Sequence, residues 1–161
     1  MNAFSIRKAN HQDAARIRRL VVRGRINPIG LDWRRFIVAV DTSGHVIGCV
    51  QLKPHGDGSV ELASLAVDED WRRQGVGALL VEVVITIHSG NLFLMCRAGL
   101  GIFYEKFGFK ALSVDQMPAY FQRVNRWMTW LGRLRPESEG LLIMWRDCGV
   151  PGVDQYPHLV G

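Results

Sequence analysis

The sequence is poor in cysteine, in lysine and in long hydrophobic stretches. Its three cysteines, Cys49, Cys96 and Cys148, are widely spaced and odd in number, which argues against a disulfide scaffold. No Cys-x-x-Cys or Cys/His pair has metal-ligand spacing, so we expect no metal site. The longest apolar run, 78–87, is interrupted by Glu82 and is shorter than the roughly 20 residues of a membrane span. The amino terminus lacks the apolar stretch of a secretory signal, and we therefore expect reduced thiols and a cytoplasmic location.

The composition is that of one folded domain. The chain has 161 residues, of which 48% are hydrophobic and 22% charged, so it can bury a core and is not a disordered or fibrous protein. We expect one domain over residues 1–148 and a flexible tail over 149–161. The net charge of +5 comes mostly from arginine, whose planar guanidinium suits phosphate groups. Nucleic acid, an anionic membrane surface or a polyanionic small ligand could each exploit that charge.

Hydrophobic periodicity predicts alternating strands and helices. Four helices are expected, one from the capping residue Asn10 to about Gly24 and three over 78–88, 100–106 and 118–134. Seven strands are expected at 4–6, 36–40, 46–53, 59–67, 91–97, 109–112 and 140–145. The helix between the fourth and fifth strands forms a crossover, so these two strands should be parallel.

The strongest single motif is Arg72-Arg73-Gln74-Gly75-Val76-Gly77, between a buried strand and an amphipathic helix. Glycines there let a ligand approach the backbone, and the start of the helix exposes unpaired N–H groups. Together they can bind a phosphate or pyrophosphate. The spacing fits neither a dinucleotide fingerprint nor a P-loop. An ordinary tight strand-to-helix turn is the alternative for this hexapeptide taken alone.

The context of this motif resembles a known superfamily. Leu65-Ala66-Val67-Asp68 precedes it directly, and Phe103-Tyr104-Glu105-Lys106-Phe107-Gly108-Phe109 follows downstream. The two motifs are similar to those of the Gcn5-related N-acetyltransferase (GNAT) superfamily and occur in the same order and at similar spacing. The order of elements agrees over about residues 4–147, and the match is sharp over 65–80 and 103–109. The resemblance implies an α/β fold with a mixed, mainly antiparallel central sheet that is splayed after the fourth strand and flanked by helices.

The resemblance also implies roles for individual residues. The strand end Leu65, Ala66 and Val67 would contact the acetyl and pantetheine part of acetyl-CoA. The pyrophosphate would bind at the turn and helix start formed by Arg72, Arg73, Gln74, Gly75, Val76, Gly77 and Ala78. Tyr104 matches the tyrosine that protonates the departing CoA thiolate in many members, which a phenol can do. Its alternative role is that of a packing aromatic.

A general base is less clearly marked. Glu61 lies six residues before Val67, where some members of the superfamily place a carboxylate that deprotonates the amine through water. A surface glutamate on an alternating strand is the alternative. His55 and His45 could also serve as bases, but both lie in or beside turns, and we rank them below Glu61. Cys96 lacks an evident activating base, and we assign it to the core.

Two features depart from the pattern of the superfamily. Arg97 stands where many members have asparagine, which puts the usual side-chain contact to the pantetheine arm in doubt. The segment 117–135 is unusually long and rich in tryptophan and arginine. Because the superfamily varies in this region with its acceptor, we expect the acceptor specificity to reside there. Within it, Trp127, Trp130, Leu131 and Leu134 follow helical spacing, and we expect them to bury together against the sheet or a partner subunit.

The sequence therefore predicts transfer of an acetyl group from acetyl-CoA to a primary amine by direct attack, with no metal. Backbone N–H near Val67 would stabilise the oxyanion. The alternatives are a non-catalytic acyl-CoA sensor and a basic nucleic-acid-binding module. Expected partners are acetyl-CoA and an amine, with no membrane and no nucleic acid, and a homodimer is left open. The identity of the amine does not follow from the sequence.

Overall fold

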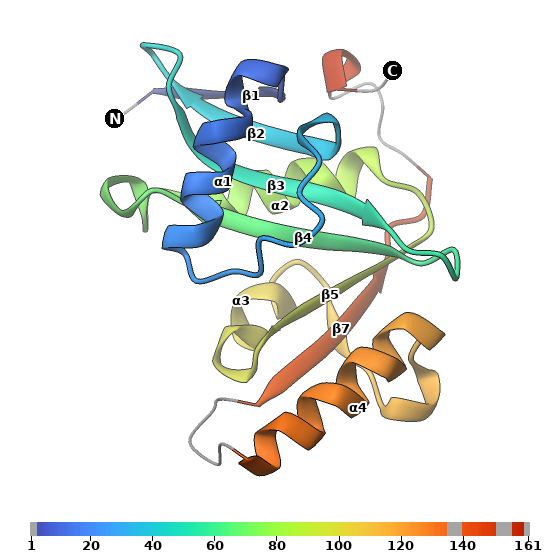
Figure 1. Ribbon diagram of the computed structural model, residues 1–161. Helices are drawn as coiled ribbons and strands as arrows, with labels where there is room; N and C mark the ends of the chain where they lie inside the picture. Colours follow the sequence, from blue (N-terminus) through green and yellow to red (C-terminus); the bar gives the residue numbers. More distant parts are fainter. Residues whose placement is uncertain (1–2, 135–139, 151–155, 160–161) are drawn as a thin grey trace.

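The protein folds around a seven-stranded sheet with helices on both faces (Figure 1). This computed structural model describes residues 3–134, 140–150 and 156–159. The strand order is β1-β2-β3-β4-β5-β7-β6, and every neighbouring pair is antiparallel except β4 and β5. The mixed, mainly antiparallel sheet expected from the sequence is therefore confirmed.

The elements follow the predicted order closely. The strands are β1 (Phe4–Lys8), β2 (Phe36–Asp41), β3 (Val46–Pro54), β4 (Val60–Val67), β5 (Asn91–Arg97), β6 (Lys110–Ala111) and β7 (Leu141–Asp147). The helices are α1 (Ala14–Arg23), α2 (Val76–Ile87), α3 (Gly101–Glu105) and α4 (Ala119–Leu134). Helix α2 begins two residues before the predicted start, directly after Gly75, whose φ of +83° is left-handed. Short 3-10 turns at 11–13, 33–35, 69–71, 98–100, 114–116 and 157–159 join or extend them.

The helices divide between the two faces of the sheet. Helices α2 and α3 lie behind the sheet in Figure 1, and α1 and α4 lie in front of it. Gly48 on β3 lets α2 pack closely, because a Cβ there would lie 2.9 Å from Val76 Cγ1 and 3.1 Å from Leu80 Cδ1. The largest core cluster is on the α2 side, and two smaller clusters lie under α1 and α4.

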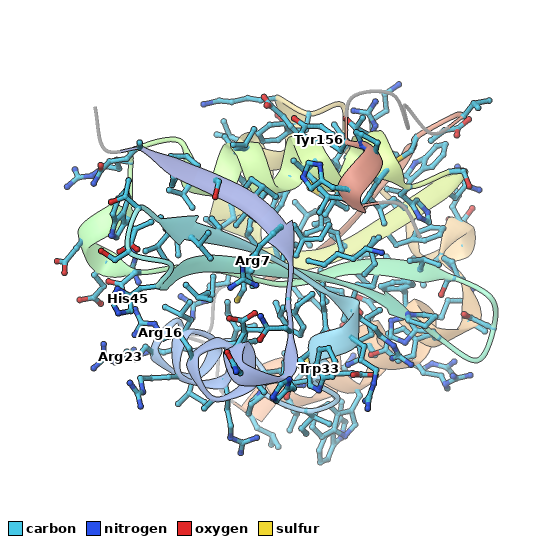
Figure 2. All side chains as sticks on the ribbon, turned by 90° about the horizontal axis from the view of Figure 1, so that it is seen from above. Arg7, Arg16, Arg23, Trp33, His45 and Tyr156 are labelled. Carbon is cyan, nitrogen blue, oxygen red and sulfur yellow. The ribbon has the colours of Figure 1, made fainter. Side chains whose placement is uncertain are left out.

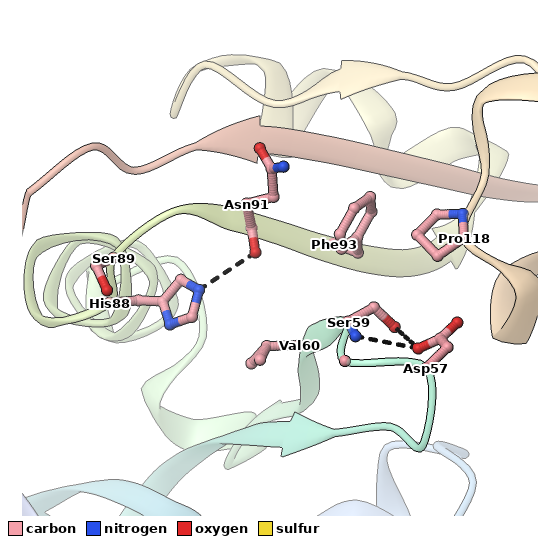
Figure 3. A pocket seen from close by; sticks show the side chains of 9 residues that line it. Asp57, Ser59, Val60, His88, Ser89, Asn91, Phe93 and Pro118 are labelled. Carbon is pink, nitrogen blue, oxygen red and sulfur yellow. Dashed lines mark hydrogen bonds between the residues drawn. The ribbon is translucent and has the colours of Figure 1, made fainter.

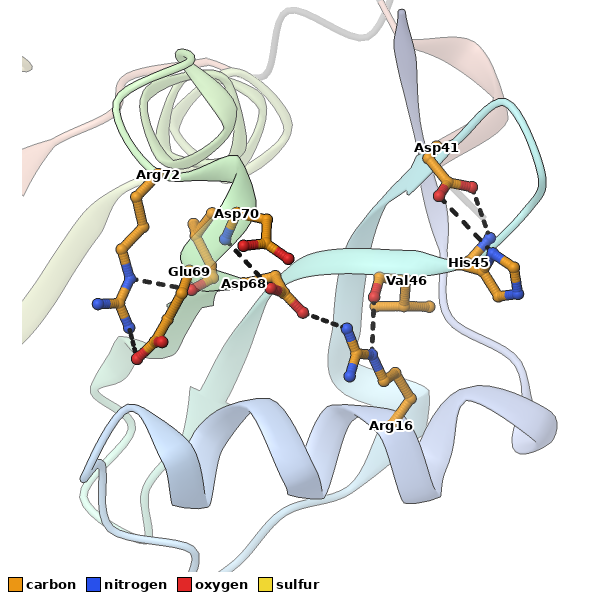
Figure 4. Close-up of polar contacts among 9 residues, drawn as sticks. Arg16, Asp41, His45, Val46, Asp68, Glu69, Asp70 and Arg72 are labelled. Atoms are coloured by element: carbon orange, nitrogen blue, oxygen red, sulfur yellow. Dashed lines mark hydrogen bonds and ion pairs between the residues drawn. The ribbon is translucent and has the colours of Figure 1, made fainter. Parts of the chain in front are cut away.

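Polar contacts fasten α1 to the sheet. Arg7 of β1 donates two hydrogen bonds to Asp13, of 2.7 and 3.0 Å, at the start of α1. Asn10 caps the same end, with its side chain accepting from Gln12 N. Arg16 of α1, labelled in Figure 2, pairs with Asp68 and donates to Val46 O (Figure 4). Arg16 therefore braces α1 and is not a solvated charge.

Strands β4 and β5 separate along their length. Within the described chain, Glu61 and Phe93 are the one pair in parallel register, close to the amino-terminal ends of both strands. Beyond that pair the strands diverge, as Figure 1 shows. The backbone edge of β4 toward Val67 therefore faces a gap without a partner strand. This is the splay after the fourth strand that the sequence predicted.

Helix α4 docks differently from the sequence expectation. Its amphipathic spacing predicted that Trp127, Trp130, Leu131 and Leu134 would bury together, against the sheet or a partner. Burial against the sheet is wrong for this stripe, because the two tryptophans are 62% and 57% exposed and Leu134 is 66% exposed. Phe121, 0% exposed, packs against Phe93 and Ile143 instead. The packing face is thus rotated around the helix, since periodicity identifies a stripe but not what it contacts.

Two further expectations concern the membrane and the tail. Among the described residues, no helix is long and apolar enough to cross a membrane. Of the tail, residues 151–155 and 160–161 lie outside the described residues. Its turn Pro157–Leu159 is described, and Leu159 is 3% exposed within the main core cluster. The predicted flexibility of the tail stays a prediction.

Candidate active site

Glu61 is buried at the closed end of the gap between β4 and β5. It is 5% exposed, and its strand neighbour across the gap is Phe93. Burial raises the pKa of Glu61 to about 7, while the positive charge of Lys53, its partner in register on β3, acts to lower it. The alternative of a surface glutamate is therefore wrong. A carboxylate with such a pKa can accept a proton near neutral pH.

His55 is the immediate partner of this carboxylate. Its Nε2 lies 2.8 Å from Glu61 Oε2, and both side chains are less than a tenth exposed. Burial lowers the pKa of His55, with Lys53 acting in the same direction, so the neutral imidazole is favoured. Sequence reasoning ranked His55 below Glu61 and missed their pairing. The signal was the tight turn 54–58, which places residues six apart on the same end of a hairpin.

A bulge in β4 follows Glu61 toward the open end of the gap. The register with β3 shifts between Cys49 and Gln51, and Ser64 has a left-handed φ of +56°. Gln51 Nε2 donates to Ser64 Oγ at 3.1 Å, and within the described structure its buried Oε1 has no hydrogen-bond partner. The bulge redirects the strand end, so Ala66 is buried on the α1 side of the sheet, while Leu65 and Val67 pack against the α2 side.

The turn before α2 has the geometry of an anion site. Arg73 and Gly75 both have left-handed φ, of +60° and +83°. By helix geometry, the N–H groups of Val76, Gly77 and Ala78 have no carbonyl within the helix to bond. A Cβ at Gly75 would meet nothing within 4 Å, and one at Gly77 would meet Val67 Cγ2 at 3.5 Å. The protein itself therefore does not require a glycine at 77, whereas a ligand lying on the backbone would.

Two side chains of the same turn form contacts that stabilise its conformation. Arg72 Nε donates to Val67 O at 3.4 Å, and its guanidinium lies 3.7 Å from Glu69 (Figure 4). Gln74 Nε2 donates to Asp70 O at 2.7 Å. These contacts hold the turn against the end of β4. Arg73 is exposed on the same turn.

Tyr104 lies on α3, on the opposite face of the sheet from Glu61. It is 7% exposed and packs edge-on against Phe103 and Phe109. Burial raises the pKa of Tyr104 well above its usual value, with Cys96 nearby acting in the same direction. Its phenol therefore stays protonated near neutral pH and has a proton to give. Burial also raises the pKa of Cys96 to about 11, in agreement with its assignment to the core.

A shallow pocket of about 390 Å³ adjoins the closed end of the gap (Figure 3). Phe93 and Val60 lie on its walls, and Asp57 and Ser59 form one rim. Asp57 accepts hydrogen bonds from Ser59 N and Oγ and from Tyr120 N. These bonds lower the pKa of Asp57 to about 2, so it is ionised at neutral pH. Among the residues with described placement, no group of three or more His, Cys, Asp or Glu could hold a metal ion.

Comparison with known proteins identifies the family. The family model of the acetyltransferase (GNAT) domain matches residues 32–111, which include Glu61, the 72–78 turn and Tyr104. The chain belongs to the GNAT superfamily. An uncharacterised N-acetyltransferase of Chlorobaculum tepidum is 34% identical over 88 residues, which are 53% of this chain and 56% of that protein. The chain thus matches little more than half the length of this relative.

Solved structures share the GNAT fold. N-acetylglutamate synthase from Neisseria gonorrhoeae, complexed with coenzyme A and N-acetyl-glutamate, superposes with a TM-score of 0.68 at 22% identity, over 93% of this chain and 36% of that one. Rv2747 from Mycobacterium tuberculosis, in complex with CoA and NLQ, superposes with a TM-score of 0.67 at 22% identity, over 89% of this chain and 98% of that one. At this identity the likeness shows the fold alone.

The sequence singled out two regions as departures from the GNAT pattern, Arg97 and residues 117–135. Arg97 is exposed at the end of β5, where many GNAT proteins have asparagine. Helix α4 lies between β6 and β7, outside the segment that the family model matches. In the first turn of α4, Tyr120 stacks on His55, which lies beside the candidate base Glu61.

Proposed function

We propose that this protein is an acetyl-CoA-dependent N-acetyltransferase that acts on a primary amine. The observation that carries the proposal is the buried carboxylate of Glu61 at the closed end of a gap whose open end adjoins the glycine-containing turn before α2. Val67 lies six residues after Glu61 on the bulged strand β4, and their register partners on β3, Gly48 and Lys53, are five residues apart, about 17 Å of strand. The two ends can therefore hold the reacting group and the phosphates of one long ligand.

The chain's own residues fit such a ligand. Gly75 and Gly77 leave the backbone of the turn accessible, and the first N–H groups of α2 are available to bind an anion. The unpaired edge of β4 from Leu65 to Val67 offers N–H and C=O groups to an extended chain that contains amides. Arg72, Gln74 and their contacts keep the turn in place, and Arg73 is free to approach a phosphate. CoA in two structural neighbours is consistent with this assignment.

Acid and base then work from opposite faces of the sheet. Acetyl-CoA supplies a thioester whose carbonyl carbon an amine can attack. Glu61 takes a proton from the amine nitrogen as the carbon–nitrogen bond forms, through a water if one intervenes. Tyr104 gives its phenolic proton to the sulfur as the carbon–sulfur bond breaks, and it regains a proton from solvent. Backbone N–H near Val67 stabilises the negative charge on the carbonyl oxygen. No covalent enzyme intermediate is needed.

The test is an acetyl-CoA consumption screen across amine classes: amino acids, polyamines, peptides with a free amino terminus, and lysine peptides. Free thiol is the readout, and a reaction without amine measures hydrolysis. Amine-dependent release of thiol together with acetylated product supports the proposal. Tight acetyl-CoA binding without turnover on any amine favours the sensor instead. Nucleic-acid affinity that falls steeply with salt and is unaffected by CoA would favour the binding module.

Some assignments remain predictions alongside this one. A cytoplasmic location and a single domain over 1–148 stay predictions, and so does a homodimer. The acceptor specificity that we assign to 117–135 is part of the proposal. The exposed Arg123, Arg126 and Arg133 of α4 are available to an anionic group on the acceptor.

A further inference from the structure

The candidate base is part of a buried pair. His55 Nε2 and Glu61 Oε2 are 2.8 Å apart, and the two side chains are 6% and 7% exposed. A neutral imidazole at this distance donates its Nε2–H to one carboxylate oxygen. The second oxygen, Oε1, then remains to accept a proton from elsewhere.

The ring of His55 is fixed by helix α4. It stacks on Tyr120 with centroids 3.5 Å apart and planes inclined by 16°. Phe121 approaches the same ring edge-on, with centroids 5.6 Å apart and planes at 80°. Two aromatic neighbours at right angles leave the imidazole little rotational freedom, so its Nε2 stays directed at Glu61.

The 54–58 turn, which carries His55, also holds helix α4 in place. Asp57 Oδ2 accepts from Tyr120 N at 2.7 Å in the first turn of α4, and Asp57 Oδ1 accepts from Ser59 N and Oγ. A carboxylate at a helix amino terminus also stabilises the helix dipole. The turn and α4 therefore hold each other, and the His55 ring is enclosed between them.

We propose that His55 is a positioning residue for Glu61, which orients the carboxylate and favours its ionised form by donating Nε2–H to Oε2. This inference rests on the proposed function only for the identity of the reaction that Glu61 serves. The proton that leaves the acceptor nitrogen goes to Oε1 of Glu61 and then to solvent, and His55 forms and breaks no covalent bond.

Other charges face the pair from three elements. Lys53 on β3 favours ionised Glu61 and neutral His55, whereas Asp57 in the turn favours protonated His55. On α4, Tyr120 adjoins Glu61. Burial raises the pKa of Tyr120, and the positive charge of Arg123 acts to lower the pKa of Tyr120. Among the described residues, removing the His55 hydrogen bond leaves Lys53 as the neighbour that favours charge on Glu61. Protonated Glu61 then becomes more stable.

Two substitutions separate the hydrogen bond from the stacking. His55→Phe keeps a ring against Tyr120 but removes the N–H. His55→Gln loses the ring but keeps an N–H near the Nε2 position. His45→Phe is the matched control, because His45 lies in the β2–β3 turn with its side chain 79% exposed. Thermal melting establishes that each variant is folded, and His55→Leu, which also lacks the N–H, replaces His55→Phe if that variant fails to fold.

The first readout is the pKa of Glu61 itself, followed by ¹³C NMR of carboxyl-labelled glutamate, with Glu61→Gln to assign the signal. We expect His55→Phe to raise this pKa by about one unit, the effect of losing one hydrogen bond to a charged group. In His55→Gln the pKa of Glu61 should lie close to its wild-type value, and His45→Phe should leave this pKa unchanged. An unchanged Glu61 pKa in folded His55→Phe overturns the proposal, whether or not any amine is acetylated.

The second readout is kcat/KM against pH with an accepted amine. In His55→Phe the acid limb should move up by about one pH unit, with a fall in kcat/KM of about fivefold at pH 7 and unchanged acetyl-CoA affinity. A wild-type profile in this variant overturns the role in catalysis. Absence of turnover in the wild type would instead refute the proposed function, and the NMR titration would still decide the role of His55.

Discussion

Glu61 and Phe93 join β4 and β5 at the point where the two strands begin to separate. The pairing places a titratable carboxylate at the apex of the gap and an aromatic ring beside it. Because the strands diverge only beyond this pair, Glu61 is enclosed by protein while the rest of the β4 edge is open. The divergence of the strands thus accounts both for the burial of Glu61 and for the unpaired edge of β4 beside it.

The first prediction concerns stability against pH in Glu61→Gln. The pKa of Glu61 is raised from 4.5 to about 7, so the folded state disfavours its ionisation. The wild type should lose stability as pH rises from about 4.5 through about 7, by an amount of the order of 3 kcal/mol, whereas Gln cannot ionise. Urea unfolding at pH 5 and pH 8 measures this. At pH 8 the free energy of unfolding of Glu61→Gln should rise relative to that of the wild type, while turnover is lost. A difference in unfolding free energy that does not change with pH would contradict the raised pKa of Glu61.

The second prediction separates cofactor binding from folding at Gly77. Gly77→Ala adds a methyl group that meets only Val67 at ordinary contact distance, and alanine favours helix by up to about 1 kcal/mol. We expect unchanged or higher stability, but acetyl-CoA affinity lowered more than tenfold, about 1.4 kcal/mol. A bulky residue at Gly75 should also weaken binding, but its left-handed φ makes that variant strained in any case.

The matched control for Gly77→Ala is Gly132→Ala. Gly132 lies within α4, where a Cβ would meet nothing within 4 Å. Calorimetry should give wild-type acetyl-CoA affinity for Gly132→Ala. If Gly77→Ala also binds like wild type, the 72–78 turn is not the phosphate site.

The third prediction is that Tyr104→Phe slows turnover roughly a hundredfold while acetyl-CoA affinity stays nearly constant. The substitution removes only the hydroxyl and keeps the ring against Phe103 and Phe109. Tyr156→Phe, at a half-buried tyrosine outside the gap, is the control. A rate within twofold of wild type would make Tyr104 a packing residue.

The fourth prediction addresses the exposed face of α4. Reversing the charges of Arg123 and Arg126 together should raise KM for the true acceptor. Acetyl-CoA binding and melting temperature should change little, because both side chains are exposed. The same variant should be weighed by light scattering, since Trp127 and Trp130 are exposed on this helix. If neither acceptor kinetics nor oligomeric mass responds, the acceptor is recognised elsewhere, and residues 26–33 are the next region to test.

The sequence by itself determined the order of elements and the position of the glycine-containing turn before α2, where we propose that the phosphates bind. Both are local properties: hydrophobic period identifies each strand and helix, and Gly75 and Gly77 mark a turn through their own backbone freedom. The parallel crossover from β4 to β5 also follows locally, from the helix between them. The sequence likewise marked Glu61 and Tyr104 as candidates.

The tertiary structure decided what those candidates contact. The pairing of Glu61 with His55 depends on how the 54–58 turn closes, and the stacking of His55 on Tyr120 joins residues distant in the chain. The exposure of Trp127 and Trp130 depends on which face of α4 reaches the sheet. Burial, pKa and side-chain pairing are properties of neighbours in space, and periodicity along a chain carries no information about them.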